Sequence, residues 1–137
     1  MWFVFAFLSA VFAALTAILS KIGVSDINSN LATAIRTVVV LIMSWMIVIF
    51  TGKHSELLNI GHKNLIYLVL SGLATGFSWL CYMKALQIGD ASKVIPVDKF
   101  SIVIGMILAF VVLKEPFTTK TIIGGVLITM GTFVLIF

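Results

Sequence analysis

Four charged residues lie inside stretches that are otherwise apolar, namely Arg36, Lys84, Asp98 and Lys99. Ionisable groups at membrane depth are costly, and they usually face a bundle interior or a water-filled cavity. Three of these groups are positive and one is negative, so one ion pair leaves positive charge in a place of low dielectric constant. An anionic or zwitterionic guest would compensate that charge, and these residue types therefore predict a binding site for such a molecule.

A simpler alternative places the same charges at the membrane surface. Lysine can extend its apolar stem along lipid and keep its ammonium group in water, which Lys84 and Lys99 could both do. In that case Asp98 only caps a helix or pairs with a neighbour. The two readings differ in whether these side chains converge on a shared space.

Asp98 and Lys99 must lie within a membrane span if their segment crosses the bilayer. The uncharged run from residue 100 to 113 has only 14 residues, whereas a span takes about 20. The helix is therefore expected to begin near Ala91. Pro96 has no N–H, so the Ser92 carbonyl loses its helical partner. That carbonyl either faces a cavity or lies in the first turns, where the disruption is mild.

The composition requires a lipid solvent. The chain of 137 residues is 61% hydrophobic and 10% charged, with a mean hydropathy of +1.23, whereas soluble domains carry about 25% charged residues. Its single cysteine, Cys81, excludes an internal disulfide and a cysteine cluster for metal. The basic residues are scattered, so neither a nucleic-acid surface nor a polybasic lipid-binding cluster is expected.

Five uncharged or nearly uncharged runs predict one all-α transmembrane domain over residues 1–137. Continuous apolar runs exclude a closed barrel, and a spanning backbone in lipid must be helical or a closed barrel. The first run is too long for a signal peptide and lacks a basic segment before it, so it is expected to be a retained span. The predicted spans are residues 2–20, 31–51, 65–86, 91–113 and 121–137.

The charged groups are expected to meet at one level of the bundle. Arg36 lies roughly 8 Å into the second span, and Asp98 and Lys99 lie roughly 10 Å into the fourth from the same side. Lys84 approaches that side within about one turn of the end of the third span. Their matched depth and opposite charge predict electrostatic coupling between Arg36 and Asp98.

Helical periodicity assigns Asp98 and Lys99 to different faces of the fourth span. At 100° per residue, Asp98 shares a face with the small residues Ser101, Gly105 and Ala109. Adjacent positions on a helix do not face one another. Asp98 is therefore expected to look into the bundle, with Lys99 at the flank beside Ile95, Met106 and Phe110.

Polar and aromatic residues of the first and third spans are the expected lining of a substrate path. Ser9 and Thr16 lie in the first span, and Trp79 and Tyr82 lie in the third. Such groups converging on a cavity suit a small organic guest. Alternatively, Trp79 and Tyr82 are anchors at the membrane–water interface.

Several short patterns occur in an order that resembles an EamA-type domain of the drug/metabolite transporter superfamily. Lys21 closes the first span, and Arg36 follows Ala34-Ile35 at the start of the second. Residues 82–86 read Tyr-Met-Lys-Ala-Leu, similar to the Tyr-x-x-Ala-Leu pattern of that family. The remaining matches are Pro96 early in the fourth span, Lys114-Glu115 in the connection between the fourth and fifth spans, and Gly124 and Gly131 in the fifth span.

The resemblance implies secondary transport of a small metabolite, often an amino acid or a related solute. Most relatives carry ten spans as two five-span halves of opposite orientation, whereas this chain resembles the short, single-repeat members. Transporters commonly place their site between inverted repeats. An antiparallel homodimer is therefore expected, with a parallel homodimer and pairing with a different half as alternatives.

Three functional hypotheses follow. The first is a dimeric permease for a small polar metabolite, amino-acid-like or anionic, in the cell membrane of a bacterium or archaeon. The second is a membrane subunit that scaffolds or regulates another protein, although such a protein has little reason to retain Arg36 and Asp98 at depth. The third, an enzyme, finds no support, because His54 and His62 flank a polar loop and no nucleophile stands beside a base. No cofactor, metal or nucleic acid is expected.

Overall fold

The computed structural model describes residues 1–116 and 118–137, apart from the side chain of Leu58. Residue 117, which belongs to the connection predicted for residues 114–120, lies outside the described residues. The described chain is helical, with short connections. Its elements are α1 (Trp2–Gly23), α2 (Ser29–Phe50), the 3-10 helix η1 (Lys53–Asn59), α3 (His62–Ile88), α4 (Ala91–Asp98), α5 (Ser101–Leu113) and α6 (Thr119–Ile136).

The predicted all-α membrane fold is confirmed. Five helical segments are long and apolar enough to cross a bilayer, with α4 and α5 together forming the fourth. Large apolar side chains are exposed along every one of them. Such a surface suits lipid, because apolar groups facing hydrocarbon carry no hydration cost.

Local side-chain and backbone features fix the helix ends. The Asn28 side chain accepts a hydrogen bond from the Asn30 N–H at 2.8 Å and caps α2, and Thr118 caps α6 in the same way. Gly52 follows α2 with a φ of 68°, a left-handed conformation that glycine adopts readily. Lys114 takes a φ of 56° and ends α5, two residues before Pro116.

The span predicted over residues 91–113 is present, but its helix is interrupted. Helix α4 ends at Asp98 and α5 begins at Ser101, with a turn between them. Pro96 lies inside α4 and removes one helical hydrogen bond. Near the break the backbone tightens, because the N–H groups of Phe100 and Ile102 each bond to the carbonyl three residues earlier, both at 3.0 Å.

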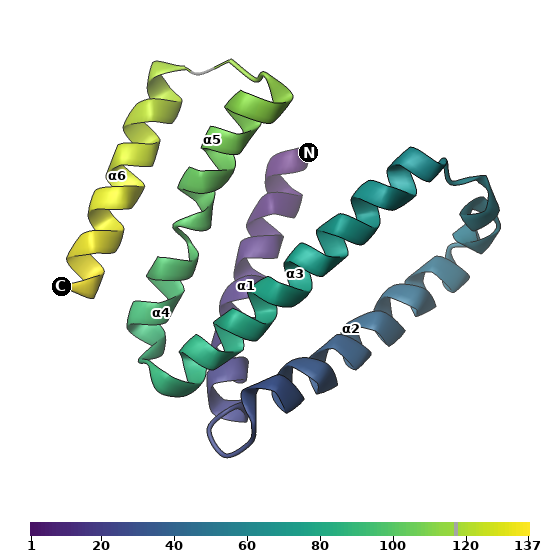
Figure 1. Cartoon of the computed structure of the whole chain (residues 1–137), viewed down its shortest axis with the longest axis horizontal. Coiled ribbons are helices and arrows are strands. Elements are labelled where there is room, and N and C mark those ends of the chain that lie inside the picture. The colour runs from purple at the N-terminus through teal and green to yellow at the C-terminus, as the bar shows by residue number, and fades with distance from the viewer. Residues whose placement is uncertain (117) are drawn as a thin grey trace. The chain divides into compact units, whose positions relative to one another are not determined.

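The described chain divides into two compact units, each considered by itself. Unit 1 comprises residues 1–18 and 88–137, and unit 2 comprises residues 19–87. In unit 1, α6 runs antiparallel beside α4 and α5 (Figure 1). A Cβ at Gly125 of α6 would lie 3.2 Å from Cε of Met106 on α5. The face of α5 that contacts α6 thus contains Met106, whereas Ser101 and Gly105 are exposed.

In unit 2, α2 and α3 are joined by η1 at one end (Figure 1). At the other end, near the start of α2 and the end of α3, Val24, Ala32, Met83 and Leu86 are buried. Polar contacts tie the same end together. The Lys21 ammonium donates to the Leu86 carbonyl at 2.6 Å, and the Gln87 amide donates to the carbonyls of Val24 and Ile27.

Candidate functional site

Arg36 lies against an aromatic ring in unit 2. Its guanidinium carbon is 5.1 Å from the centroid of the Trp79 ring, within the range of a cation–π contact. One of its terminal nitrogens, Nη1, donates to Sδ of Met83 at 3.2 Å. Trp79 and Met83 are four residues apart on α3, so they lie on one face of that helix. Arg36 is half-buried between them and its own helix α2.

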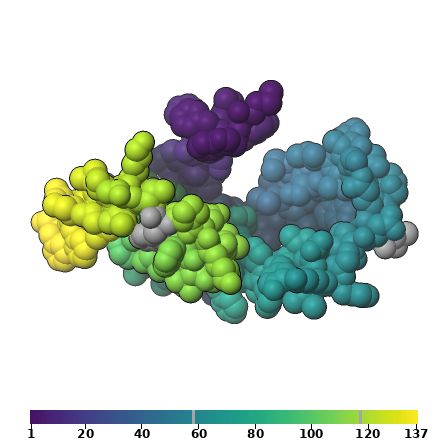
Figure 2. Space-filling model, turned by 90° about the horizontal axis from the view of Figure 1, so that it is seen from above, coloured from purple at the N-terminus to yellow at the C-terminus, as the bar shows by residue number. Residues whose placement is uncertain are grey.

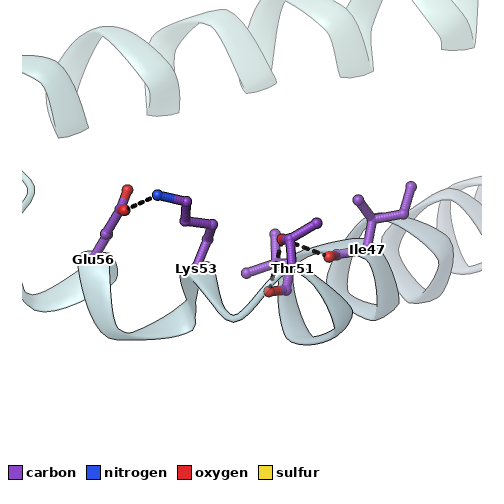
Figure 3. A network of polar contacts seen from close by, with 5 residues as sticks. Ile47, Thr51, Lys53 and Glu56 are labelled. Atoms are coloured by element: carbon purple, nitrogen blue, oxygen red, sulfur yellow. Dashed lines mark hydrogen bonds and ion pairs between the residues drawn. The ribbon is translucent and has the colours of Figure 1, made fainter.

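The carboxylates of unit 2 are engaged elsewhere. Asp26 accepts a hydrogen bond from the Ser25 hydroxyl at 3.0 Å. Glu56 forms an ion pair with Lys53 within η1, close to the Thr51 hydroxyl that bonds back to Ile47 (Figure 3). Within the described residues of unit 2, no carboxylate pairs with Arg36. Its positive charge is thus met by an aromatic face and a thioether, which are weak partners compared with a carboxylate.

A groove of about 1040 Å³ runs between α2 and α3 and is closed at one end by η1. Figure 2 views this unit from above, with α2 in blue and α3 in teal. Thr37 and Trp79 line the groove next to Arg36, and the remaining lining mixes polar, small and apolar residues. They are Val40, Leu41, Ser44, Trp45, Val48, Lys53, His54, Glu56, Leu57, Asn59, Ile60, Gly61, Asn64, Leu68, Ser71, Gly72, Thr75 and Gly76.

A groove of this kind can hold a small polar molecule. Hydroxyls of Ser44, Ser71 and Thr75 lie along it, and Gly72 and Gly76 leave open space where a Cβ would stand. Its volume is close to the upper end of the range of about 300–1,000 Å³ that is typical of ligand pockets. Arg36, beside the lining residues Thr37 and Trp79, and the hydroxyls along the walls could bind an anionic head and a polar tail.

Asp98 and Lys99 bond to each other in unit 1. The Lys99 ammonium lies 3.2 Å from Oδ2 of Asp98, and the two side chains are 49% and 32% exposed, respectively. We expected their side chains to diverge, as neighbours on a continuous helix do. They meet where the helix breaks, directly after Asp98.

The other predicted site residues are divided between the two units, so whether they meet stays a prediction. Lys84 is exposed and donates to the Gln87 side chain at 3.1 Å, beside the end of α3. Tyr82 and Thr16 are half-buried, and Ser9 is exposed on α1. Arg36 and Asp98 belong to different units, and their coupling therefore stays a prediction. Of the predicted site residues in unit 2, the structure brings Arg36 and Trp79 together.

Sequence reasoning missed the role of Met83 and the polar end of the groove. Met83 lies within the Tyr-x-x-Ala-Leu pattern, one turn after Trp79, and that spacing was the available signal. His54 was expected beside a polar loop, but it lies in η1, whose residues Lys53, His54 and Glu56 line the end of the groove. A short 3-10 helix leaves no periodic pattern from which it could be recognised.

Comparisons with known proteins agree with this architecture. The EamA-like transporter family matches residues 1–137. A curated protein of Sinorhizobium sp., named "Uncharacterized transporter in cobO 3'region", is 46% identical over 134 residues, which cover 98% of this chain and 95% of the relative. No solved structure matches the chain. The five-span helical chain, a multi-pass membrane protein, therefore belongs to the EamA-like transporter family.

Proposed function

We propose that this protein is a secondary transporter that moves a small polar metabolite, amino-acid-like or anionic, across the cell membrane of a bacterium or archaeon. Membership of the EamA-like family and the transporter-named relative support transport in general. One observation carries the choice of substrate. Arg36 contacts Trp79, which lines the groove, and has no carboxylate partner from the described part of its own unit.

Arg36 is suited to bind the carboxylate or phosphate of the guest. A guanidinium group offers five donors in a planar fork, which matches the two oxygens of a carboxylate. Contact with the Trp79 ring restricts the Arg36 guanidinium group before a guest binds. Binding therefore costs little additional conformational entropy of the Arg36 side chain. Because the groove continues past Thr37 towards Ser44 and Thr75, the uncharged part of the guest lies along hydroxyl-bearing walls.

Transport by a five-span chain requires a second copy in this proposal. The Sinorhizobium relative, of which 95% is covered, is about as short as this chain. Basic residues divide five against four between the two membrane sides, so the sequence imposes little orientation. Two copies inserted oppositely give an inverted pair. The exposed Ser101 and Gly105 on α5 supply a surface of small residues for close helix contact.

Counterflow separates transport from a scaffolding role. Purified protein in liposomes loaded with unlabelled amino acids and small organic anions is mixed with trace labelled solutes. We expect accumulation above that of protein-free liposomes. Trp79→Ala and Tyr82→Ala are expected to slow it, while Lys63→Gln, which removes an exposed charge outside the groove, leaves it intact. Uptake no faster than in empty liposomes contradicts transport and favours the scaffolding alternative.

Topology is tested with single cysteines at Ser55 and Ser92, both exposed, in a Cys81→Ser background. An impermeant thiol reagent is applied from either side of the membrane. The antiparallel dimer predicts that each site is labelled from both sides, because the two copies are inserted oppositely. Labelling of each site from one side alone contradicts the antiparallel arrangement.

A further inference from the structure

The break between α4 and α5 holds the one carboxylate that lies within a predicted membrane span. The other four acidic residues, Asp26, Glu56, Asp90 and Glu115, lie in connections, in η1 or at a helix end. Asp98 is the last residue of α4, roughly 10 Å along its helix from Ala91. In transporters, broken helices supply the sites of coupling ions, with cations at the carboxyl ends of the half-helices.

At the carboxyl end of α4 the cation is the ammonium group of Lys99, which belongs to the same chain. Its ammonium lies 3.2 Å from Oδ2 of Asp98, and within the described residues of unit 1 no other side chain donates to that carboxylate. The pair is neutral overall while both groups are charged. A change in the protonation of Asp98 would leave the Lys99 charge uncompensated, which is costly away from water.

Within the described residues of unit 1, the elements packed on this break bring no other charge to it. The contact of Met106 with Gly125 sets the register of α5 against the antiparallel α6. Counting seven residues back from Met106 reaches Lys99, and counting seven forward from Gly125 on the antiparallel α6 reaches Thr132. Thr132 is buried, and its hydroxyl donates to the Ile128 carbonyl at 2.9 Å. The charged residue of α6, Lys120, is roughly 18 Å away along the helix. Helix α5 carries no charged residue, and Asp90 and Lys93 lie at the opposite end of α4.

We infer that Asp98 is the proton-binding residue of transport, with Lys99 as the partner that senses its charge. A proton from water forms an O–H bond on the Asp98 carboxylate, and Lys99 keeps its own proton. Asp98 and Lys99 together then carry one net positive charge, which favours an anionic guest. The proton and a monoanion therefore cross the membrane together with no net transfer of charge. On the other side Asp98 returns the proton to water and again pairs with Lys99.

A proton fits this place better than a metal cation does. Sodium or another metal ion requires several oxygen ligands and would have to displace the ammonium of Lys99, which is held on the same chain. A proton needs one carboxylate oxygen and leaves Lys99 where it lies. This inference rests on the proposed transport function and extends it by naming the coupling ion.

The test compares two rates in liposomes with a mixture of labelled amino acids and small dicarboxylates. One is counterflow without a pH gradient, and the other is net uptake driven by a lower pH outside. We expect the gradient to raise wild-type net uptake about fivefold or more. In Asp98→Asn the pH gradient should no longer raise net uptake, while counterflow without a gradient continues. Asp98→Glu should keep the response, as should the matched control Glu115→Gln, whose carboxylate lies outside the spans.

The outcomes separate the two proposals. Wild-type counterflow with no response to the gradient, or a response that persists in Asp98→Asn, overturns the role of Asp98 but leaves transport standing. Absence of wild-type counterflow overturns transport and the proton site with it. If Asp98→Asn does not fold, Asp98→Glu decides, because loss of its gradient response while counterflow continues contradicts a titrating carboxylate at this position.

Discussion

The two charged places of this chain differ in how their positive charge is balanced. In unit 2, Arg36 lies on the Trp79 ring and against the Met83 sulfur, with no carboxylate beside it in the described part of that unit. In unit 1, Lys99 has its own carboxylate in the neighbouring residue, Asp98. The first place is short of one negative charge, which a guest can supply. The second is neutral overall while both groups are charged.

The two places also differ in whether the helix that carries the charge is continuous. Arg36 stands within the unbroken helix α2, which has a side-chain cap at its start, so its position relative to Trp79 depends on the packing of two continuous helices. Asp98 and Lys99 stand where a helix is interrupted. A rigid platform suits recognition of a substrate, whereas a discontinuous helix suits a site that changes during the cycle.

The largest effect is expected at Arg36. Arg36→Gln removes the charge that binds the guest, and hydrogen bonds to charged groups are worth about 1.5–3 kcal/mol. The kcat/KM of counterflow should therefore fall roughly 10- to 100-fold. Arg36→Lys should retain part of the activity, since it keeps the charge and loses the fork. Unchanged kinetics in folded Arg36→Gln would remove the main difference between the two places.

A second effect tests the packing that supports the broken helix. Gly125→Leu forces a side chain against Met106, since even a Cβ would lie 3.2 Å from its Cε. Overpacking of this kind costs about 1–3 kcal/mol. Thermal unfolding in detergent should show a lower Tm than for Gly124→Leu, the adjacent matched control, where a Cβ meets nothing within 4 Å. Equal Tm values would mean that α5 and α6 do not pack through Gly125.

Most of the architecture could be predicted from the sequence because lipid imposes a simple rule on it. Each span must be a long apolar helix, and the five runs were visible as such. The contact of Arg36 with Trp79 depends on how α2 and α3 pack, and neither helix encodes its partner in its own periodicity. The pairing of Asp98 with Lys99 agrees with the simpler alternative, in which Asp98 pairs with a neighbour. It was not the favoured expectation, because the geometry of a continuous helix separates neighbouring side chains.

A double-mutant cycle asks whether the two places act together. We predict that Arg36 and Asp98 are coupled, so that Arg36→Gln with Asp98→Asn harms stability or transport less than the sum of the single changes. Coupling energies between interacting groups are about 0.5–3 kcal/mol. The Asp98 and Lys99 cycle serves as the internal reference, since these two side chains are in contact. Strict additivity of the Arg36 and Asp98 changes would make the two places independent.

The smallest effect is expected at the ion pair of η1. Lys53 and Glu56 are 65% and 64% exposed, and exposed pairs contribute less than about 1 kcal/mol. Glu56→Gln should therefore leave the Tm almost unchanged. It should leave counterflow within about twofold of wild type if the guest's charge is bound at the Arg36 end of the groove. A loss of activity as large as that of Arg36→Gln would move the charge-binding end of the groove to η1.

The central claim, that Arg36 holds a negative group of the substrate, is tested most directly by matched pairs of solutes. Counterflow is measured with labelled small organic acids and with the carboxamide of each, which has nearly the same shape and no charge. We predict that at least one acid is exchanged much faster than its amide, by about tenfold or more, and that Arg36→Gln largely removes this preference. Equal exchange of every acid and amide by the wild type, or a preference that survives in Arg36→Gln, would contradict the claim.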